Sequence, residues 1–270
     1  MLLPLGLSYI TFKLISYLTD IHWKVITPGS FLEVLCYSSL FTIFVAGPIE
    51  RFSAFAPQIR QPASRWSSEY AEAAAQRIAV GLFKKLVIAD WIGYFTQPVW
   101  ANPASYGWGI YALALLGYSL QIYLDFAGYS DLAIGSSKLF GLTIMENFDW
   151  PYLQPNISLF WRHWHISLSS WIRDYLFFPL GGMSRADVWN LFAVPLIAMG
   201  LCGLWHGPAW HFALWGIWIG LGISAGQLWN RQKRFHPALK ALADSRAFTL
   251  LSTLGTFLFV TIGWIWFRGW

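Results

Sequence analysis

Long apolar stretches recur along this chain, and they constrain its fold more than any other feature. The hydrocarbon core of a bilayer is about 30 Å thick, so a helix needs about 20 mostly apolar residues to cross it. Stretches of that kind predict membrane-spanning helices over Leu2–Leu18, Phe31–Ile49, Ala71–Phe95, Trp108–Leu124, Val188–Leu204, Trp210–Trp229 and Phe248–Phe267. The predicted fold class is all-α, a polytopic transmembrane helical bundle that forms a single domain over residues 1–270.

The composition agrees with a lipid environment. Hydrophobic residues make up 56% of the chain and charged residues only 11%, whereas a soluble domain carries about 25% charged residues. The net charge of +5 comes from basic residues in short segments between the apolar stretches, which is typical of membrane orientation signals. We therefore expect membrane lipid, and not nucleic acid, as a partner. Cys36 and Cys202 lie in apolar runs, so both are predicted to be small buried hydrophobes.

The segment Asn147–Gly182 differs from the apolar stretches. It contains Pro151, Pro155 and Pro179 among aromatic and charged residues. Irregular backbone at membrane depth must be buried in protein or line a wet cavity. We therefore expect short interfacial or re-entrant helices here.

Basic residues predict the orientation of the chain. With the loop Arg231–Arg246 in the cytoplasm and the helices alternating, the segments 138–185 and 50–65, which also carry basic residues, lie inside. The loop Thr96–Gly107 carries no charge and lies outside, as does the turn at Trp205–Pro208. Each loop then obeys the positive-inside rule, which predicts a multi-pass protein of the inner (cytoplasmic) membrane.

His206 is the leading candidate for a functional residue, because ionisable side chains within apolar spans are costly and functional by default. Glycines on both sides permit a close approach by another chain or by substrate, and Pro208 is predicted to start the next helix. A histidine that only hydrogen-bonds within a helical hairpin is an equally good interpretation of the composition.

Other polar residues have structural interpretations beside functional ones. His163 and His165 are two residues apart and would face different ways on a helix, so we expect no metal site. Arg162 and Arg173 suit a phosphate or carboxylate, or snorkel at the interface. Asp125 is predicted to be buried and paired, and Lys84 and Lys85 are expected either to form a local ion pair with Asp90 or to snorkel. His22 and His211 are predicted to be structural, and His236 to be solvated.

An ordered set of motifs resembles the bacterial membrane-bound O-acyltransferase family. The motifs are Ala46–Ile49 (AGPI), Gly81–Lys85 (GLFKK), Gln121–Asp131 (QIYLDFAGYSD), Glu146–Phe148 (ENF), Phe160–Ser169 (FWRHWHISLS), Trp171–Tyr175 (WIRDY), Pro179–Gly182 (PLGG) and Gly203–Gly207 (GLWHG). The run Arg173–Gly182 is most similar to the alginate O-acetylase branch. Members of that branch usually carry further helices before Pro4 and more chain after Trp270, so a core shortened at both ends is expected.

The resemblance implies an enzyme that moves an acyl group, expected to be acetyl, from a cytoplasmic thioester to a hydroxyl of an extracytoplasmic polysaccharide. His206 matches the family's catalytic histidine, and His165 matches its second functional position. The resemblance also implies supporting or donor-binding roles for Arg162, Trp164, Arg173, Asp174, Asp125 and Trp205. His163 stands where an arginine is common. A tunnel between the two faces would let donor and acceptor meet.

The residues alone do not decide the acyl donor, the partner proteins or the functional class. The donor is acetyl-CoA or a carrier thioester, with no bound cofactor expected, and a periplasmic acetyltransferase or another glycan-modification protein is an expected partner. Transfer of D-alanyl or another acyl group to a cell-wall polymer is the alternative within the family. A transporter and a non-catalytic membrane scaffold are the alternatives outside it, although no symmetry between halves favours a transporter.

Overall fold

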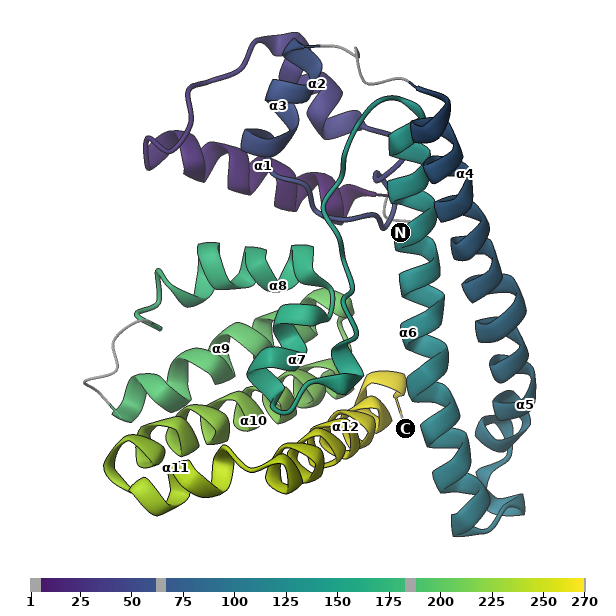
Figure 1. Cartoon of the computed structure of the whole chain (residues 1–270), viewed down its shortest axis with the longest axis vertical. Coiled ribbons are helices and arrows are strands. Elements are labelled where there is room, and N and C mark those ends of the chain that lie inside the picture. The colour runs from purple at the N-terminus through teal and green to yellow at the C-terminus, as the bar shows by residue number, and fades with distance from the viewer. Residues whose placement is uncertain (1–5, 62–66, 183–187, 270) are drawn as a thin grey trace. The chain divides into compact units, whose positions relative to one another are not determined.

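The computed structural model describes residues 6–61, 67–182 and 188–269, and the helices of this part are shown in Figure 1. Within it the regular elements are helices, and the one extended pairing is an isolated antiparallel bridge between Phe148 and Trp164. The all-α prediction is confirmed. The predicted start at Leu2 and the basic residues Arg65 and Arg185 lie outside the described residues.

The chain divides into two compact units. The first comprises Met1–Pro98 and Leu120–Asn147, and the second comprises Val99–Ser119 and Phe148–Trp270. The first unit holds α1 (Leu7–His22), α2 (Phe31–Ser39), α3 (Phe52–Arg60), α4 (Ser68–Leu82), the π-helix η1 (Phe83–Ala89), most of α5 (Asp90–Ala101) and the later part of α6 (Trp108–Leu139). The second holds the short 3-10 helices η2 (Pro103–Ser105) and η3 (Pro151–Leu153), then α7 (Ile157–His163), α8 (Ile166–Ile172), the π-helix η4 (Arg173–Phe177), α9 (Val188–His206), α10 (Trp210–Phe235), α11 (Pro237–Ala243) and α12 (Arg246–Arg268).

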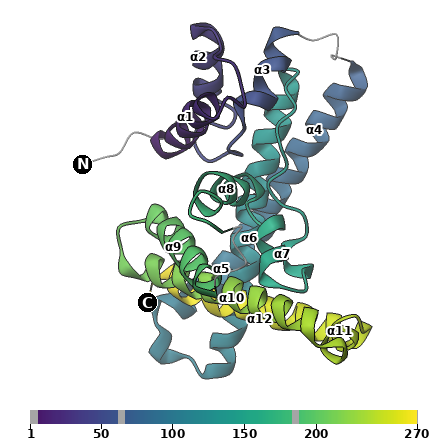
Figure 2. The same ribbon diagram turned by 90° about the vertical axis from the view of Figure 1, so that its left-hand side faces the viewer.

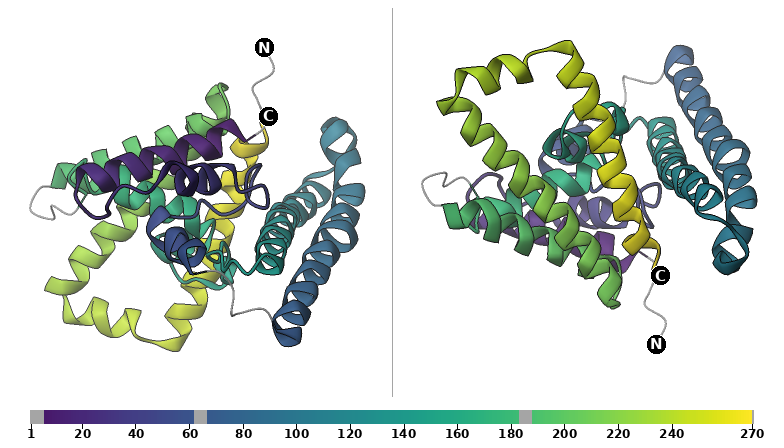
Figure 3. Two further views of the ribbon diagram at one scale, coloured as in Figure 1. Left: turned by 90° about the horizontal axis from the view of Figure 1, so that it is seen from above. Right: turned by 90° about the horizontal axis from the view of Figure 1, so that it is seen from below.

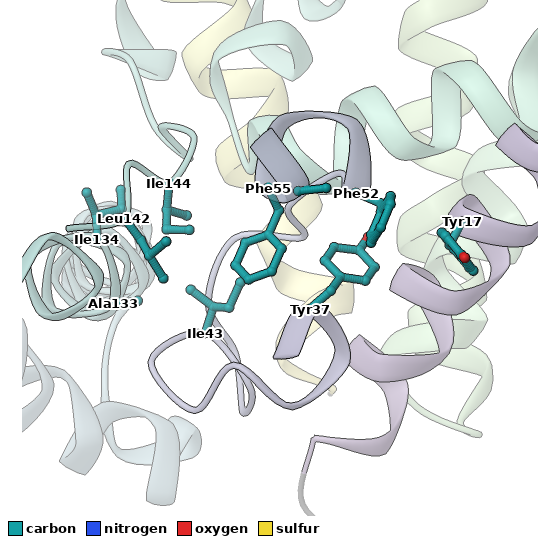
Figure 4. Close-up of a cluster of buried hydrophobic side chains, with 10 residues drawn as sticks. Tyr17, Tyr37, Ile43, Phe52, Phe55, Ala133, Ile134, Leu142 and Ile144 are labelled. Atoms are coloured by element: carbon teal, nitrogen blue, oxygen red, sulfur yellow. The ribbon is translucent and has the colours of Figure 1, made fainter. Parts of the chain in front are cut away.

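A buried aromatic and aliphatic cluster forms the core of the first unit (Figure 4). Tyr37 and Phe55 are each 1% exposed, and they pack with Phe52 and Tyr17 from neighbouring helices. Residues that follow α6, such as Ile144, belong to the same cluster. The loop after α6 is thereby held against α1–α3.

The predicted span Phe31–Ile49 is only partly helical. Ser30 and Glu33 form a capping box that starts α2, but the helix ends at Ser39 and turns follow. The apolar residues of the turns serve the core instead, since Ile43 and Ile49 are 1% and 0% exposed. An apolar run of this length therefore does not form a spanning helix here, because the residues of its second half are buried in the core of the protein.

Four of the described helices are long and apolar enough to cross a membrane. They are Trp108–Leu139, Trp189–His206, Trp210–Phe235 and Arg246–Arg268, and each includes most or all of a predicted span. The last three belong to the second unit, where α11 connects α10 to α12 at the end where those two helices splay apart (Figure 3). In length and composition these helices are typical of a membrane protein.

The helical region predicted over Ala71–Phe95 contains a π-helical segment, η1, between α4 and α5. α4 runs beside the later part of α6 (Figures 1 and 2), where Gly81 and Gly128 allow a close approach because a Cβ on either would lie within 2.8 Å of the other's carbonyl oxygen. The successive lysines of η1 both reach α6, with Lys84 Nζ 2.7 Å from Asp131 and Lys85 Nζ 2.5 Å from Asp125. π-helical bulges are rare and frequent at functional sites.

Candidate functional site

The α9–α10 hairpin positions His206. Its two helices pack closely because α9 has glycine at 203 and α10 has glycine at 216. A Cβ on Gly203 would lie 2.1 Å from the Phe212 carbonyl oxygen, and one on Gly216 would lie 2.0 Å from that of Met199. The close approach predicted around His206 is therefore made by the next helix of the same chain. That helix begins at Trp210 with Ala209 as N-cap, two residues later than the start predicted at Pro208.

His206 is the last residue of α9 and is partly exposed. Its imidazole is surrounded by aromatic rings, with centroid distances of 4.7 Å to Trp205, 5.3 Å to Trp215 and 5.0 Å to Phe267. These neighbours hold the ring in a defined position. A histidine so placed suits proton transfer with a bound hydroxyl.

His165 lies at a break between two short helices. α7 ends at His163, Trp164 is extended and pairs with Phe148, and His165 precedes α8 with φ 43° and ψ 55°. Left-handed backbone is uncommon for residues other than glycine, although histidine is among those enriched there. Backbone strain of this kind clusters at functional sites. The side chain is 2% exposed, and its Nδ1 lies 3.4 Å from Ser167 Oγ.

His206 influences the second predicted catalytic histidine, His165, within the second unit. Burial, and secondly the nearby His206, lower the pKa of the His165 imidazole to about 3. His165 is therefore neutral across the physiological pH range and carries one ring N–H donor and one ring acceptor. A neutral imidazole close to a second imidazole suits acid–base chemistry that places no permanent charge in the site.

Trp164 forms a buried aromatic platform beside His165. It is 5% exposed, stacks on Phe160 at 5.5 Å and meets Trp264 of α12 at 5.1 Å. Trp264 Nε1 donates to the Tyr152 hydroxyl at 3.1 Å, and that hydroxyl donates to the Ser119 carbonyl oxygen at 2.7 Å. These contacts hold the short helices around His165 against α12 and the early part of α6.

The predicted arginines lie on the surface and outside this aromatic cluster. Arg162 is exposed. Arg173 donates to its neighbour Asp174 at 2.7 and 3.2 Å, and its guanidinium lies over Phe178. His163, which replaces a common arginine, is held locally, with Nδ1 donating to the Leu159 carbonyl oxygen at 2.8 Å. The segment is built of short helices, as predicted.

Two predictions of burial are wrong. Asp125 lies in the first unit with its side chain 47% exposed, because α6 continues to Leu139 and turns Asp131 inward instead. Asp131 has a side chain only 6% exposed and pairs with Arg77 and Lys84. The pairing of Asp125 itself is confirmed, through Lys85, which also binds Asp90 as predicted. Cys36 is exposed on α2, whereas Cys202 is buried on α9.

Trp161 and Trp215 were not singled out by the sequence. Trp215 packs directly on His206, and Trp161 packs on Trp215 with centroids 5.8 Å apart. Tryptophan is so frequent in this chain, with 18 copies, that no sequence signal separates these two from interface anchors. Among the residues that the structure describes, no three His, Cys, Asp or Glu side chains form a group suited to a metal ion.

Comparison with known proteins gives consistent matches along the chain. A model of the membrane-bound O-acyltransferase family, MBOAT, matches residues 5–262. The chain is 37% identical to the probable alginate O-acetylase AlgI of Pseudomonas aeruginosa, over 99% of this chain and 49% of that protein. It is 30% identical to a peptidoglycan O-acetyltransferase of Helicobacter pylori, over 54% of that protein, and 31% identical to a teichoic acid D-alanyltransferase of Streptococcus thermophilus, over 68%. The chain thus spans about half the length of the first of these relatives.

Proposed function

The chain belongs to the membrane-bound O-acyltransferase family, and from that premise we propose that it transfers an acetyl group from a thioester to a hydroxyl of an extracytoplasmic polysaccharide. The observation that carries the proposal is the aromatic packing that links the two histidines: Trp164, next to His165, contacts Trp264, which stacks on Trp215, and Trp215 contacts the His206 ring. The similarity to an alginate O-acetylase over 99% of this chain favours acetyl as the group and a polyuronate as the acceptor.

His206 is proposed as the general base. One ring nitrogen accepts the proton of the acceptor hydroxyl while the hydroxyl oxygen attacks the thioester carbonyl carbon. The carbon–sulfur bond then breaks, the ester forms, and the imidazolium returns its proton to the leaving thiolate. Acid–base assistance of this kind is typically worth about 10²–10⁴ in rate.

His165 is proposed as the partner of His206. Its low pKa keeps the ring neutral, so it offers a hydrogen-bond donor to the thioester carbonyl oxygen without bringing a full charge into an apolar site. The interruption of the helix before α8 supports this role, because the His165 ring can then point in a direction that a continuous helix would not allow.

The predicted orientation supports a division of donor and acceptor between the two membrane faces. The α9–α10 turn next to His206 is predicted to face outward, and the basic segments inward. We propose a multi-pass protein of the inner membrane, with a donor such as acetyl-CoA or a carrier thioester entering from the cytoplasm. A periplasmic acetyltransferase or another glycan-modification protein is the proposed partner outside.

Transfer of D-alanyl to a cell-wall polymer is the second candidate. The teichoic acid D-alanyltransferase relative, 31% identical over 98% of this chain, favours it. The two candidates share the base and the thioester step, and they differ in the donor. A donor comparison therefore separates them.

The test uses sealed membrane vesicles that contain the full chain. Radiolabelled acetyl-CoA or a D-alanyl carrier-protein thioester is supplied on the cytoplasmic side, and deacetylated alginate or teichoic acid on the other. We expect alkali-labile acetyl on alginate, and none with His206→Ala. If neither donor transfers its label to the acceptor, so that wild type behaves like His206→Ala, the enzyme proposal is overturned. Transfer of D-alanyl alone would favour the second candidate.

A further inference from the structure

We propose that the indole N–H groups of Trp215 and Trp161 bind the oxygen on which negative charge develops during acyl transfer. The inference deepens the proposed function and rests on it, since that oxygen is the thioester carbonyl oxygen of the donor. It assigns oxyanion stabilisation to two residues that neither the motifs nor the relatives' names assign.

Both indoles are buried beside the predicted base. Trp215 is 1% exposed and Trp161 is 7% exposed. Trp215 lies 5.3 Å from the His206 ring, and Trp161 lies 5.8 Å from Trp215, centroid to centroid. Trp161 also lies four residues before His165, in the helix that precedes the backbone break. The pair thus contacts the base through one member and adjoins the segment of the second histidine through the other.

Neither indole nitrogen has a hydrogen-bond acceptor within the described part of the chain, and both are closed to solvent. More than about 90% of buried polar groups in proteins have a partner, so two such donors in contact call for an explanation. Lipid tails offer no acceptor to them. An oxygen that arrives with the substrate is the explanation that fits their place beside His206.

Neighbouring tryptophans show that this part of the fold does satisfy indole donors where their role is structural. Trp218, one turn after Trp215 on α10, donates to the Phe259 carbonyl oxygen at 3.0 Å. Trp264, which stacks on Trp215, donates to the Tyr152 hydroxyl at 3.1 Å. The contrast separates Trp215 and Trp161 from these two structural indoles.

The chemistry suits a charge that exists only during the reaction. As the acceptor oxygen attacks, the carbonyl carbon becomes tetrahedral, the π electrons move to the carbonyl oxygen, and the acceptor proton goes to His206. Donors fixed in a dry site stabilise such an oxygen most when its charge is greatest. When the thiolate leaves and the carbonyl re-forms, these hydrogen bonds weaken again.

The experiment compares three single substitutions in the full chain in membranes. Trp215→Phe and Trp161→Phe each delete an N–H with no acceptor in the protein, and Trp218→Phe is the matched control that deletes an N–H bound to a carbonyl. Acetyl transfer from labelled acetyl-CoA and thermal unfolding are measured for all three. β-(3-Benzothienyl)-alanine at position 215 replaces the N–H by sulfur at nearly constant volume, which removes any effect of a cavity.

We expect kcat to fall by about a hundredfold for Trp215→Phe and for the benzothienyl variant, which is the typical loss on removing one oxyanion donor. A fall of similar size is expected for Trp161→Phe, and kcat of Trp218→Phe should stay near the wild-type value. The benzothienyl variant should keep the wild-type unfolding midpoint, because it breaks no hydrogen bond in the protein, whereas Trp218→Phe should lower the midpoint.

Wild-type kcat in Trp215→Phe and Trp161→Phe would overturn the inference. So would a benzothienyl variant that unfolds at a much lower temperature than wild type, because the N–H would then have a structural partner. A wild-type protein that transfers no acetyl group would instead contradict the proposed function. The unfolding of the benzothienyl variant is measured without substrate and would still decide whether the N–H has a partner in the protein.

Discussion

The rings of His206 and Trp215 stand nearly perpendicular, with an interplanar angle of 87° and centroids 5.3 Å apart. His206 ends α9 and Trp215 lies in the first half of α10, so the contact ties the predicted base to the packing of the hairpin. Small shifts between the two helices would move the base relative to its neighbours, and misplacement of a catalytic group is costly in rate.

His206→Gln should lower kcat by about 10²–10⁴-fold, because glutamine fills similar space but cannot take up a proton near neutral pH. Acetyl transfer in membranes measures this, and quantification of the inserted protein separates activity from expression. His236→Gln is the matched control, since His236 is exposed and follows α10. Equal activity of His206→Gln and His236→Gln would contradict the assignment.

Gly216→Ala should destabilise the protein by about 1–3 kcal/mol, because the added methyl would lie 2.0 Å from the Met199 carbonyl oxygen and must push the helices apart. Transfer activity should fall as well, through displacement of His206. Gly255→Ala on α12 is the control, since no described atom beyond its chain neighbours and the nearby backbone of its own helix lies within 4 Å of the added Cβ, and the gain in helix propensity is up to about 1 kcal/mol. Thermal unfolding in detergent compares them, and equal midpoints would refute the close-packing account.

Stability should fall as the pH drops below about 6.5 because of His165. The folded-state pKa of His165 is lowered to about 3, below the ordinary value, so the unfolded chain binds the proton more readily than the folded one. This part of the stability is present above pH 6.5 and is lost progressively toward pH 3, at about 1.4 kcal/mol per pH unit.

His165→Asn tests that pH dependence, because asparagine tolerates the left-handed backbone at this position and does not titrate. Unfolding midpoints measured from pH 7.5 to pH 4.5 should fall less steeply in the variant than in wild type. Parallel curves for the two proteins would show that His165 is not a buried neutral imidazole.

Asp131→Asn should cost about 1–3 kcal/mol, because Arg77 and Lys84 would lose a shared carboxylate whose side chain is 6% exposed. Asp125→Asn should cost less than about 1 kcal/mol, since Asp125 is 47% exposed and Lys85 keeps Asp90. Unfolding of both variants under identical conditions gives the comparison. A larger loss for Asp125→Asn would reverse the ranking of these two carboxylates.

Features that depend on local sequence could be predicted. Long apolar runs over 188–204, 210–229 and 248–267 each fall within one observed helix, because a run that satisfies its own backbone needs no distant partner. The prolines and polar residues between Asn147 and Gly182 likewise indicated short helices, and the ordered motifs indicated the family, which the match over residues 5–262 shows.

Features that depend on contacts between distant segments were decided only by the tertiary structure. The run after Ser39 left the helix because Ile43 and Ile49 are buried in the core of the first unit. The partners on α4 and η1 determined that Asp131, and not Asp125, is the buried carboxylate. The indoles of Trp161 and Trp215 differ from those of Trp218 and Trp264 in what their nitrogens meet. A residue's type and spacing determine which helix it can join, whereas its burial and its hydrogen-bond partner depend on side chains far away in the chain.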